Sequence, residues 1–233
     1  MNFFRNILKS SKEIIIVYIL TYLIVIISAL IYIALGFSNL FNFINNYCIY
    51  ILLIYYCLVI IYLYTKNKKK EQKLSLKSHF ILLLLGTSLA VIYNMIIYKL
   101  IPPTTNTITL ILPLISSGII GPIFEEILFR YLLFNRLNEK YNTIKAIIID
   151  SIIFAVIHIN PIKIVYAFIL GIILNLSYHK YKNIKAPILI HMSANIIVLF
   201  IKKYNPLILI ISIITLIISL ILNKLDRRVA WTT

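Results

Sequence analysis

Cysteine is scarce in this chain of 233 residues, and its pattern excludes two classes of protein. The only cysteines, Cys48 and Cys57, lie in one apolar run. They match neither the spacing of a metal site nor the disulfide framework of a small secreted protein. We interpret both as small buried hydrophobic residues, which is how free cysteine behaves in protein interiors.

Acidic residues are also scarce, with 7 Asp and Glu against 23 Lys and Arg, and the formal net charge is +16. A positive charge of this size can indicate nucleic-acid binding. Here, however, the basic residues lie between apolar runs, where they set membrane topology and attract anionic lipid headgroups. We therefore expect the lipid bilayer as a partner, and no nucleic acid.

Hydrophobic residues make up 61% of the chain, and the mean hydropathy is +0.97. A soluble domain is about 45–50% apolar, and helices that cross a bilayer need about 20 apolar residues. The sequence predicts an all-α, polytopic membrane protein with a bundle of eight transmembrane helices. We expect them at about 14–36, 44–65, 79–101, 108–134, 144–160, 162–179, 184–201 and 206–223.

The N-terminus resembles the charged start of a signal peptide, but the run from Ile14 to Ala34 is too long for one. We expect a retained first membrane helix. No soluble domain fits between the apolar runs, so we expect a single membrane domain. We divide it into the N-terminal helices (1–107), the helices with the polar motifs (108–201), and the last helix with its tail (202–233).

The loops predict the orientation. With the N-terminus inside, 18 Lys and Arg residues are cytoplasmic and 4 are outside, a bias that favours eight spans with both termini cytoplasmic. The outer residues are Lys99, Lys163, Lys202 and Lys203; the inner ones are Arg5, Lys9, Lys12, six lysines between Lys66 and Lys77, Arg136, Lys140, Lys145, Lys180, Lys182, Lys185, Lys224, Arg227 and Arg228.

Ionisable residues within the apolar runs indicate a site, because each costs roughly 2.5–3.5 kcal/mol at the centre of a bilayer. In the fourth run, Glu126 and Arg130 are four residues apart and can pair on one helix face. Glu125 is turned by about 100° and stays free to act as a general base on water. The alternative is that both acids only neutralise Arg130 near the inner interface.

Pro122 precedes this pair of glutamates and leaves two conformations open. If the helix continues through it, the proline frees the Gly118 carbonyl and bends the helix. If the helix restarts there, the glutamates lie near a helix N-terminus, where the dipole favours negative charge.

Two further runs carry polar residues at four-residue spacing. Asp150, Phe154 and His158 form one stripe, in which Asp150 is either a partner of the site or, as we prefer, an acid in the first turns near the cytoplasm. His191 and Asn195 can donate to one point, as a developing oxyanion requires. The alternative for this pair is an interhelical hydrogen-bond clamp, which is our interpretation of Asn175.

A metal site stays open at this point. His, His and Glu form a known zinc set, but the HExxH pattern that would favour zinc is missing. The sequence therefore assigns no cofactor, although a divalent metal is compatible with it.

The motifs EExxxR, FxxxH and HxxxN, in this order on membrane helices, resemble the CPBP or Abi family, the type II CAAX prenyl endopeptidase and bacteriocin-processing enzymes. The stretch from Ala167 to Asn195 is similar to the third conserved block of that family. The resemblance covers about Pro113 to Leu199. It implies an eight-helix bundle with a conical cavity.

The resemblance also implies roles. Glu125 would activate water, His158 would share that water, and His191 and Asn195 would stabilise the oxyanion. Glu126 and Arg130 match the accompanying acid and arginine. Some members are called metalloproteases, but their metal requirement is disputed. This chain departs from the family at Asn175, where a small residue is more usual, and Asp150 lies outside the motifs.

These features predict a glutamate-dependent intramembrane endopeptidase for a hydrophobic or lipidated peptide or membrane protein, in pheromone or bacteriocin processing or self-immunity. The Ile, Lys, Asn and Tyr bias suggests a prokaryotic cell membrane. The alternative is a non-catalytic immunity or scaffold protein that regulates a partner. A proton-coupled transporter is disfavoured, because the sequence has a single polar cluster and no inverted repeat.

Overall fold

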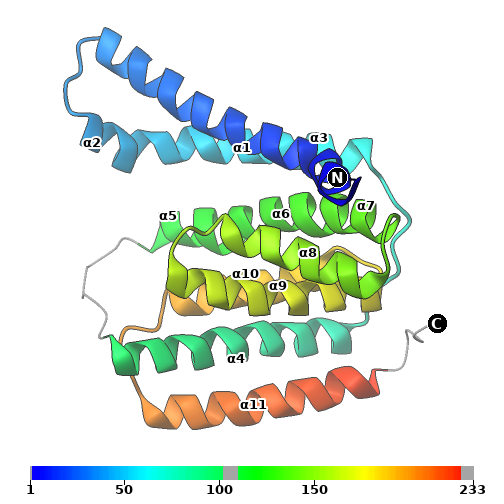
Figure 1. Cartoon of the computed structure of the whole chain (residues 1–233). Helices are drawn as coiled ribbons and strands as arrows, with labels where there is room; N and C mark the ends of the chain where they lie inside the picture. Colours follow the sequence, from blue (N-terminus) through cyan, green and yellow to red (C-terminus); the bar gives the residue numbers. More distant parts are fainter. Residues whose placement is uncertain (1, 102–109, 227–233) are drawn as a thin grey trace.

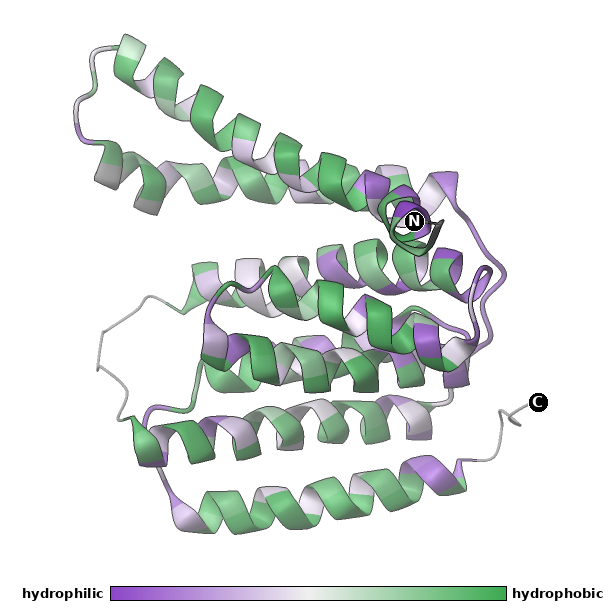
Figure 2. Ribbon diagram, viewed as in Figure 1, coloured by the Kyte–Doolittle hydropathy of each residue, from purple (hydrophilic) through white to green (hydrophobic). Residues whose placement is uncertain are grey.

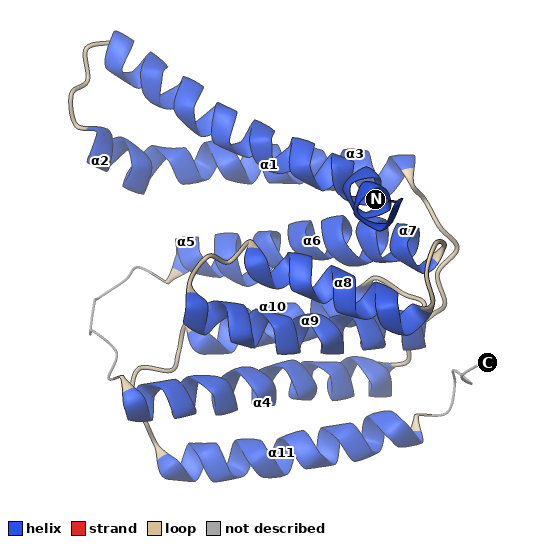
Figure 3. Cartoon of the chain, in the orientation of Figure 1, coloured by secondary structure: helices blue, strands red, loops and turns tan. Residues whose placement is uncertain are grey.

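The computed structural model describes residues 2–101 and 110–226, and within these ranges every regular element is a helix (Figure 3). In chain order the elements are α1 (Asn2–Ala34), α2 (Leu40–Phe43), η1 (Ile44–Cys48), α3 (Ile49–Lys66), α4 (Leu76–Leu100), α5 (Ile111–Pro113), η2 (Leu114–Ile120), α6 (Gly121–Glu126), η3 (Ile127–Phe134), α7 (Asn135–Asn138), α8 (Thr143–Val156), α9 (Pro161–Tyr181), α10 (Lys185–Val198) and α11 (Pro206–Leu225).

These elements form eight helical rods, because α2 to α3 run on without a break and so do α5 to α7. Six rods are long and apolar enough to cross a bilayer, whereas α8 and α10 have only 14 residues each. The prediction of an all-α polytopic membrane protein is confirmed. The expected start of the fourth helix at residue 108 lies outside the described residues.

The rods pack in layers (Figure 1). A hairpin of α1 and α3 covers one side, α11 lies beside α4 on the other, and α6, α8, α9 and α10 lie between them. In the most apolar stretch of α4, 44% of the residues are buried, against 17% in α1 and 11% in α11. The outer helices therefore present most of their apolar side chains to lipid, and the inner helices are left to build a site.

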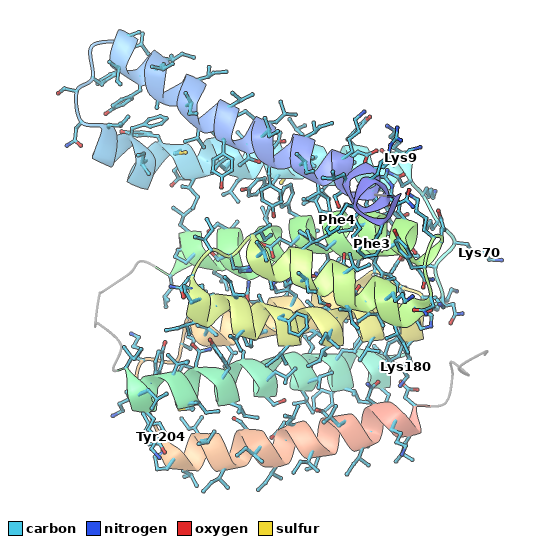
Figure 4. All side chains as sticks on the ribbon, in the orientation of Figure 1. Phe3, Phe4, Lys9, Lys70, Lys180 and Tyr204 are labelled. Atoms are coloured by element: carbon cyan, nitrogen blue, oxygen red, sulfur yellow. The ribbon has the colours of Figure 1, made fainter. Side chains whose placement is uncertain are left out.

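The two ends of the bundle differ in charge. Hydrophilic residues gather mainly at the end where the N-terminus lies (Figure 2), and Lys9, Lys70 and Lys180 lie there, away from Tyr204 (Figure 4). Hydrogen bonds join the segments at this end: the Gln72 N–H donates to the Lys182 carbonyl, and Lys180 donates to Asn223. We call it the lysine-rich end, and the other the opposite end. Arg227 and Arg228, predicted to belong to it, lie outside the described residues.

The fourth rod is continuous through Pro122, so the first of the two conformations expected there is the observed one. The residues before it form the π-helix η2, and the Gly121 N–H donates to the carbonyl of Ser116, five residues back. A second π-helix, η3, follows Glu126. Widened turns of this kind are frequent at functional sites, and here they flank both glutamates.

Gly86 allows α4 and α10 to come into close contact. A Cβ atom at this position would lie 2.1 Å from the Ile190 carbonyl oxygen and 2.2 Å from Ser193 Oγ. We expect Gly86→Ala to lower the stability by about 1–3 kcal/mol, since overpacking forces the backbones apart. The loss of stability can be measured by thermal unfolding with a thiol-reactive dye, because unfolding exposes the buried thiol of Cys48 to the dye.

The control for this prediction is Leu83→Ala, on the exposed part of the same helix. It should unfold close to the wild-type temperature. A Gly86→Ala protein as stable as the wild type would show that the two helices do not approach this closely.

Candidate active site

The four residues predicted to act in catalysis line a single cavity of about 310 Å³. Glu125 comes from α6, His158 follows the end of α8, and His191 and Asn195 come from α10. The rest of the wall is mostly apolar and aromatic, with Phe154, Tyr166, Leu170, Val198 and Leu199 among its residues. Mostly apolar walls with a few converging polar groups are typical of binding sites for small ligands.

The two adjacent glutamates differ in environment, as the sequence predicted. Glu126 is completely buried, and Arg130 Nη1 donates to its Oε1 at 3.2 Å. Glu125 faces the cavity, and 26% of its side chain is exposed. The predicted ion pair between Glu126 and Arg130 is thus present, and Glu125 is the accessible acid.

His191 lies between both carboxylates, a contact that the sequence did not predict. Its Nδ1 is 2.7 Å from Glu126 Oε1, and its Nε2 is 3.8 Å from Glu125 Oε2. A carboxylate oxygen accepts hydrogen bonds, so Nδ1 carries the hydrogen and donates a hydrogen bond to Glu126. This bond orients the ring and leaves Nε2 as the nitrogen on the side of Glu125.

Asp150 is a partner of the site, so our preferred interpretation of it, as an acid near the cytoplasm without a role in the site, was wrong. Its side chain is fully buried, and its Oδ2 lies 3.7 Å from Arg130 Nε. Asn175 Nδ2 donates to the same oxygen at 2.7 Å, which confirms that Asn175 is an interhelical clamp between α9 and α8. Asp150 thus shares Arg130 with Glu126, and a buried charge needs such a partner.

Arg130 is held from several sides. Its Nη2 donates to the Gly171 carbonyl at 3.3 Å, and its guanidinium carbon lies 4.2 Å from the centre of the Phe154 ring. A Cβ atom at position 171 would come within 3.3 Å of Nη2. Gly171 therefore admits the guanidinium beside α9. The stretch from Ala167 to Asn195 that resembles the third conserved block contains this glycine, but the sequence does not show that it faces Arg130.

Phe154 is the second residue whose role the sequence analysis missed. Its ring packs edge-on against His158 at 5.0 Å and against His191 at 5.8 Å, measured between ring centres. One aromatic side chain thus contacts both imidazoles and the arginine. The sequence feature that could have indicated its role is its position one turn before His158. Its contacts with Arg130 and His191 could not be predicted, because those residues belong to other helices.

The orientation of His158 is fixed by its own helix. Its Nδ1 lies 2.9 Å from the Phe154 carbonyl oxygen. A carbonyl only accepts hydrogen bonds, so Nδ1 donates and Nε2 remains as an acceptor. A ring in this state can accept a hydrogen bond from a water molecule in the cavity.

Asn195 is half-buried and reaches two cavities. Its Nδ2 donates to the Ser117 carbonyl at 2.9 Å, which leaves the second hydrogen of the amide available. A further cavity of about 270 Å³ lies between α3 and the fourth rod, and Glu125, Asn195 and Ser117 line it too. Glu125 and Asn195 therefore stand at the boundary between the two cavities.

Within residues 2–101 and 110–226, no group of three or more His, Cys, Asp or Glu side chains is arranged to hold a metal ion. Nδ1 of His158 and Nδ1 of His191 each donate a hydrogen bond, which leaves Nε2 as the nitrogen of each ring that can bind a ligand or water.

The family of type II CAAX prenyl endopeptidase Rce1-like proteins matches residues 107–197. This part of the chain is similar to Rce1-like proteins, and the match covers less than half of the chain. The resemblance read from the three motifs is confirmed, and the Rce1-like segment contains all four residues of the cavity predicted to be catalytic.

Two curated relatives also match. The putative membrane peptidase YdiL of Bacillus subtilis (strain 168) is 35% identical over 91 residues, 39% of this chain and 37% of that protein. The membrane-embedded CAAX protease MroQ of Staphylococcus aureus (strain USA300) is 33% identical over 144 residues, 53% of this chain and 58% of MroQ. The chain thus spans less than two thirds of each relative, and their names alone do not assign it an activity. No solved structure matches the chain.

Proposed function

We propose that the chain is a glutamate-dependent intramembrane endopeptidase that hydrolyses a peptide bond in a hydrophobic or lipidated substrate. The observation that carries the proposal is the single cavity lined by Glu125, His158, His191 and Asn195. The cavity lies in a multi-pass membrane protein whose Rce1-like segment is similar to a membrane peptidase and a CAAX protease.

In the first step, a water molecule held between Glu125 and the Nε2 atom of His158 loses a proton to Glu125. Its oxygen attacks the carbonyl carbon of the scissile peptide bond. General-base catalysis of this kind requires an accessible base within hydrogen-bonding reach of water, and Glu125 is the acid with access to the cavity.

The carbonyl oxygen becomes an oxyanion, which Asn195 and a protonated His191 Nε2 would stabilise by donating hydrogen bonds. Glu126 lies 2.7 Å from Nδ1 of the same ring, so this carboxylate would compensate a positive charge on the imidazole after Glu125 has taken the proton. The tetrahedral intermediate then collapses: the C–N bond breaks, and Glu125 returns its proton to the departing amine. Donors that are fixed in advance contribute strongly in a site with little water.

The substrate is proposed to be a peptide pheromone, bacteriocin precursor or similar peptide, or a membrane protein. A mostly apolar cavity that lies among lipid-facing helices suits a hydrophobic segment.

The test is hydrolysis by the purified chain in lipid nanodiscs, with a panel of apolar peptides in water enriched in ¹⁸O. Mass spectrometry should detect cleaved peptides with one ¹⁸O atom in the new carboxylate. If no peptide is cleaved, and if cells with alanine at Glu125 and His191 keep the wild-type phenotype, the chain acts as a non-catalytic membrane partner.

Asn195→Ala should reduce kcat by about 10²- to 10³-fold and change KM little, because an oxyanion donor acts mainly in the transition state. The matched control is Asn94→Ala. Asn94 lines the same cavity, and its amide donates to the Ala90 carbonyl of its own helix. Equal losses in the two variants would contradict the role of Asn195.

A further inference from the structure

The cavity lies in the half of the bundle that is remote from the lysine-rich end. Its wall includes Asn94 near the end of α4, His158 after the end of α8, Lys163 in the first turn of α9, and Val198 and Leu199 at the end of α10. All these helix termini lie at the opposite end, where Figure 1 shows the loops between α8 and α9 and between α10 and α11. Lys163, an exposed residue, marks the mouth of the cavity.

The path from the cavity to the lysine-rich end is closed. Glu126, Arg130 and Asp150 are fully buried, and so are the apolar residues around them, such as Phe154 and Ile190. On the fourth rod, every residue of η3 is buried as well. The charged cluster of Glu126, Arg130 and Asp150 and the apolar residues around it therefore form a plug. A peptide can reach Glu125 only from the opposite end of the bundle or through the side walls of the cavity.

Charge distinguishes the two ends on a membrane. Among the described residues, the opposite end carries four basic residues and no acid, whereas the lysine-rich end carries sixteen Lys and Arg together with Glu13, Glu71, Glu139 and Asp226. Lys and Arg are retained on the cytoplasmic side during insertion. This bias places the lysine-rich end in the cytoplasm and the mouth of the cavity towards the exterior.

We infer that the catalytic cavity opens on the extracytoplasmic side and that its substrate is an extended apolar peptide segment presented from the outer half of the bilayer. The cleavage part of this inference rests on the proposed function; the orientation does not. A substrate of this class reaches the site after it has been inserted or exported, and a cytoplasmic peptide does not.

The orientation is tested by cysteine labelling in intact bacterial cells. Cys48 and Cys57 are first replaced by Ser, and a single cysteine is then placed at Lys163 or Lys202 at the opposite end, or at Lys70 at the lysine-rich end; all three residues are exposed. A membrane-impermeant maleimide should label Lys163→Cys and Lys202→Cys in intact cells. It should label Lys70→Cys only after permeabilisation. The reverse pattern would overturn the inference, whether or not the protein is a peptidase.

The substrate side is tested with two single-pass reporter proteins that carry the same cleavable apolar segment at the outer or the inner boundary of the membrane. Only the outer reporter should be cut, and Glu125→Gln should abolish the cut. Cleavage of the inner reporter alone would refute the inference but support the peptidase. If neither reporter is cut while the labelling pattern holds, the proposed function fails and the outward orientation of the cavity stands.

Discussion

Glu125→Gln is expected to lower the rate of peptide hydrolysis by about 10²- to 10⁴-fold, the usual contribution of a general base. The amide keeps the size of the side chain but cannot take a proton from water. Little else should change, because the Glu125 carboxylate faces the cavity and lies 3.8 Å from His191 Nε2, beyond hydrogen-bonding distance. The measurement is kcat/KM of purified protein, together with its thermal unfolding temperature.

Two variants serve as comparisons for this prediction. Glu139→Gln alters an exposed acid outside the cavity and should leave both activity and stability unchanged. Glu126→Gln should lower the stability, because that carboxylate is buried and accepts from both Arg130 and His191. If Glu125→Gln hydrolyses peptides at the wild-type rate, the proposed mechanism is wrong.

The sequence predicted those parts of the site that lie within one helix. Residues four apart share a helix face, so the pairing of Glu126 with Arg130 and the separate environment of Glu125 followed from spacing alone. A continuous apolar run likewise predicts a spanning helix, and six of the rods are long enough to cross a bilayer. Spacing therefore determines local geometry well.

Contacts between helices could not be predicted in this way. The depth of His191 depends on how α10 is placed against α6, and only the structure brings its ring within 2.7 Å of Glu126. For Asp150 the spacing gave a wrong interpretation, because its partners Arg130 and Asn175 belong to other helices. The π-helical turns also escaped prediction, since they have no clear pattern of their own. The three motifs were brought to one site by the family resemblance.

Arg130→Met is expected to reduce the stability of the protein by about 3–5 kcal/mol, the usual effect of removing one partner from a buried ion pair. Methionine fills much of the space of the arginine but leaves two carboxylates, on Glu126 and Asp150, without their cation. Both side chains are fully buried. Thermal unfolding monitored by the reactivity of Cys48 with a thiol-specific dye would measure the loss.

Arg136→Met makes the same substitution in a different setting. Arg136 pairs with Glu13, but 28% of its side chain and 38% of that of Glu13 are exposed, and exposed pairs contribute only about 0–1 kcal/mol. Adding Glu126→Gln and Asp150→Asn to Arg130→Met should recover most of the stability, because the uncompensated charges are then gone. If Arg130→Met lowers the stability as little as Arg136→Met does, the buried charges of Glu126, Arg130 and Asp150 do not stabilise one another. The plug below the cavity would then be held together by apolar packing alone.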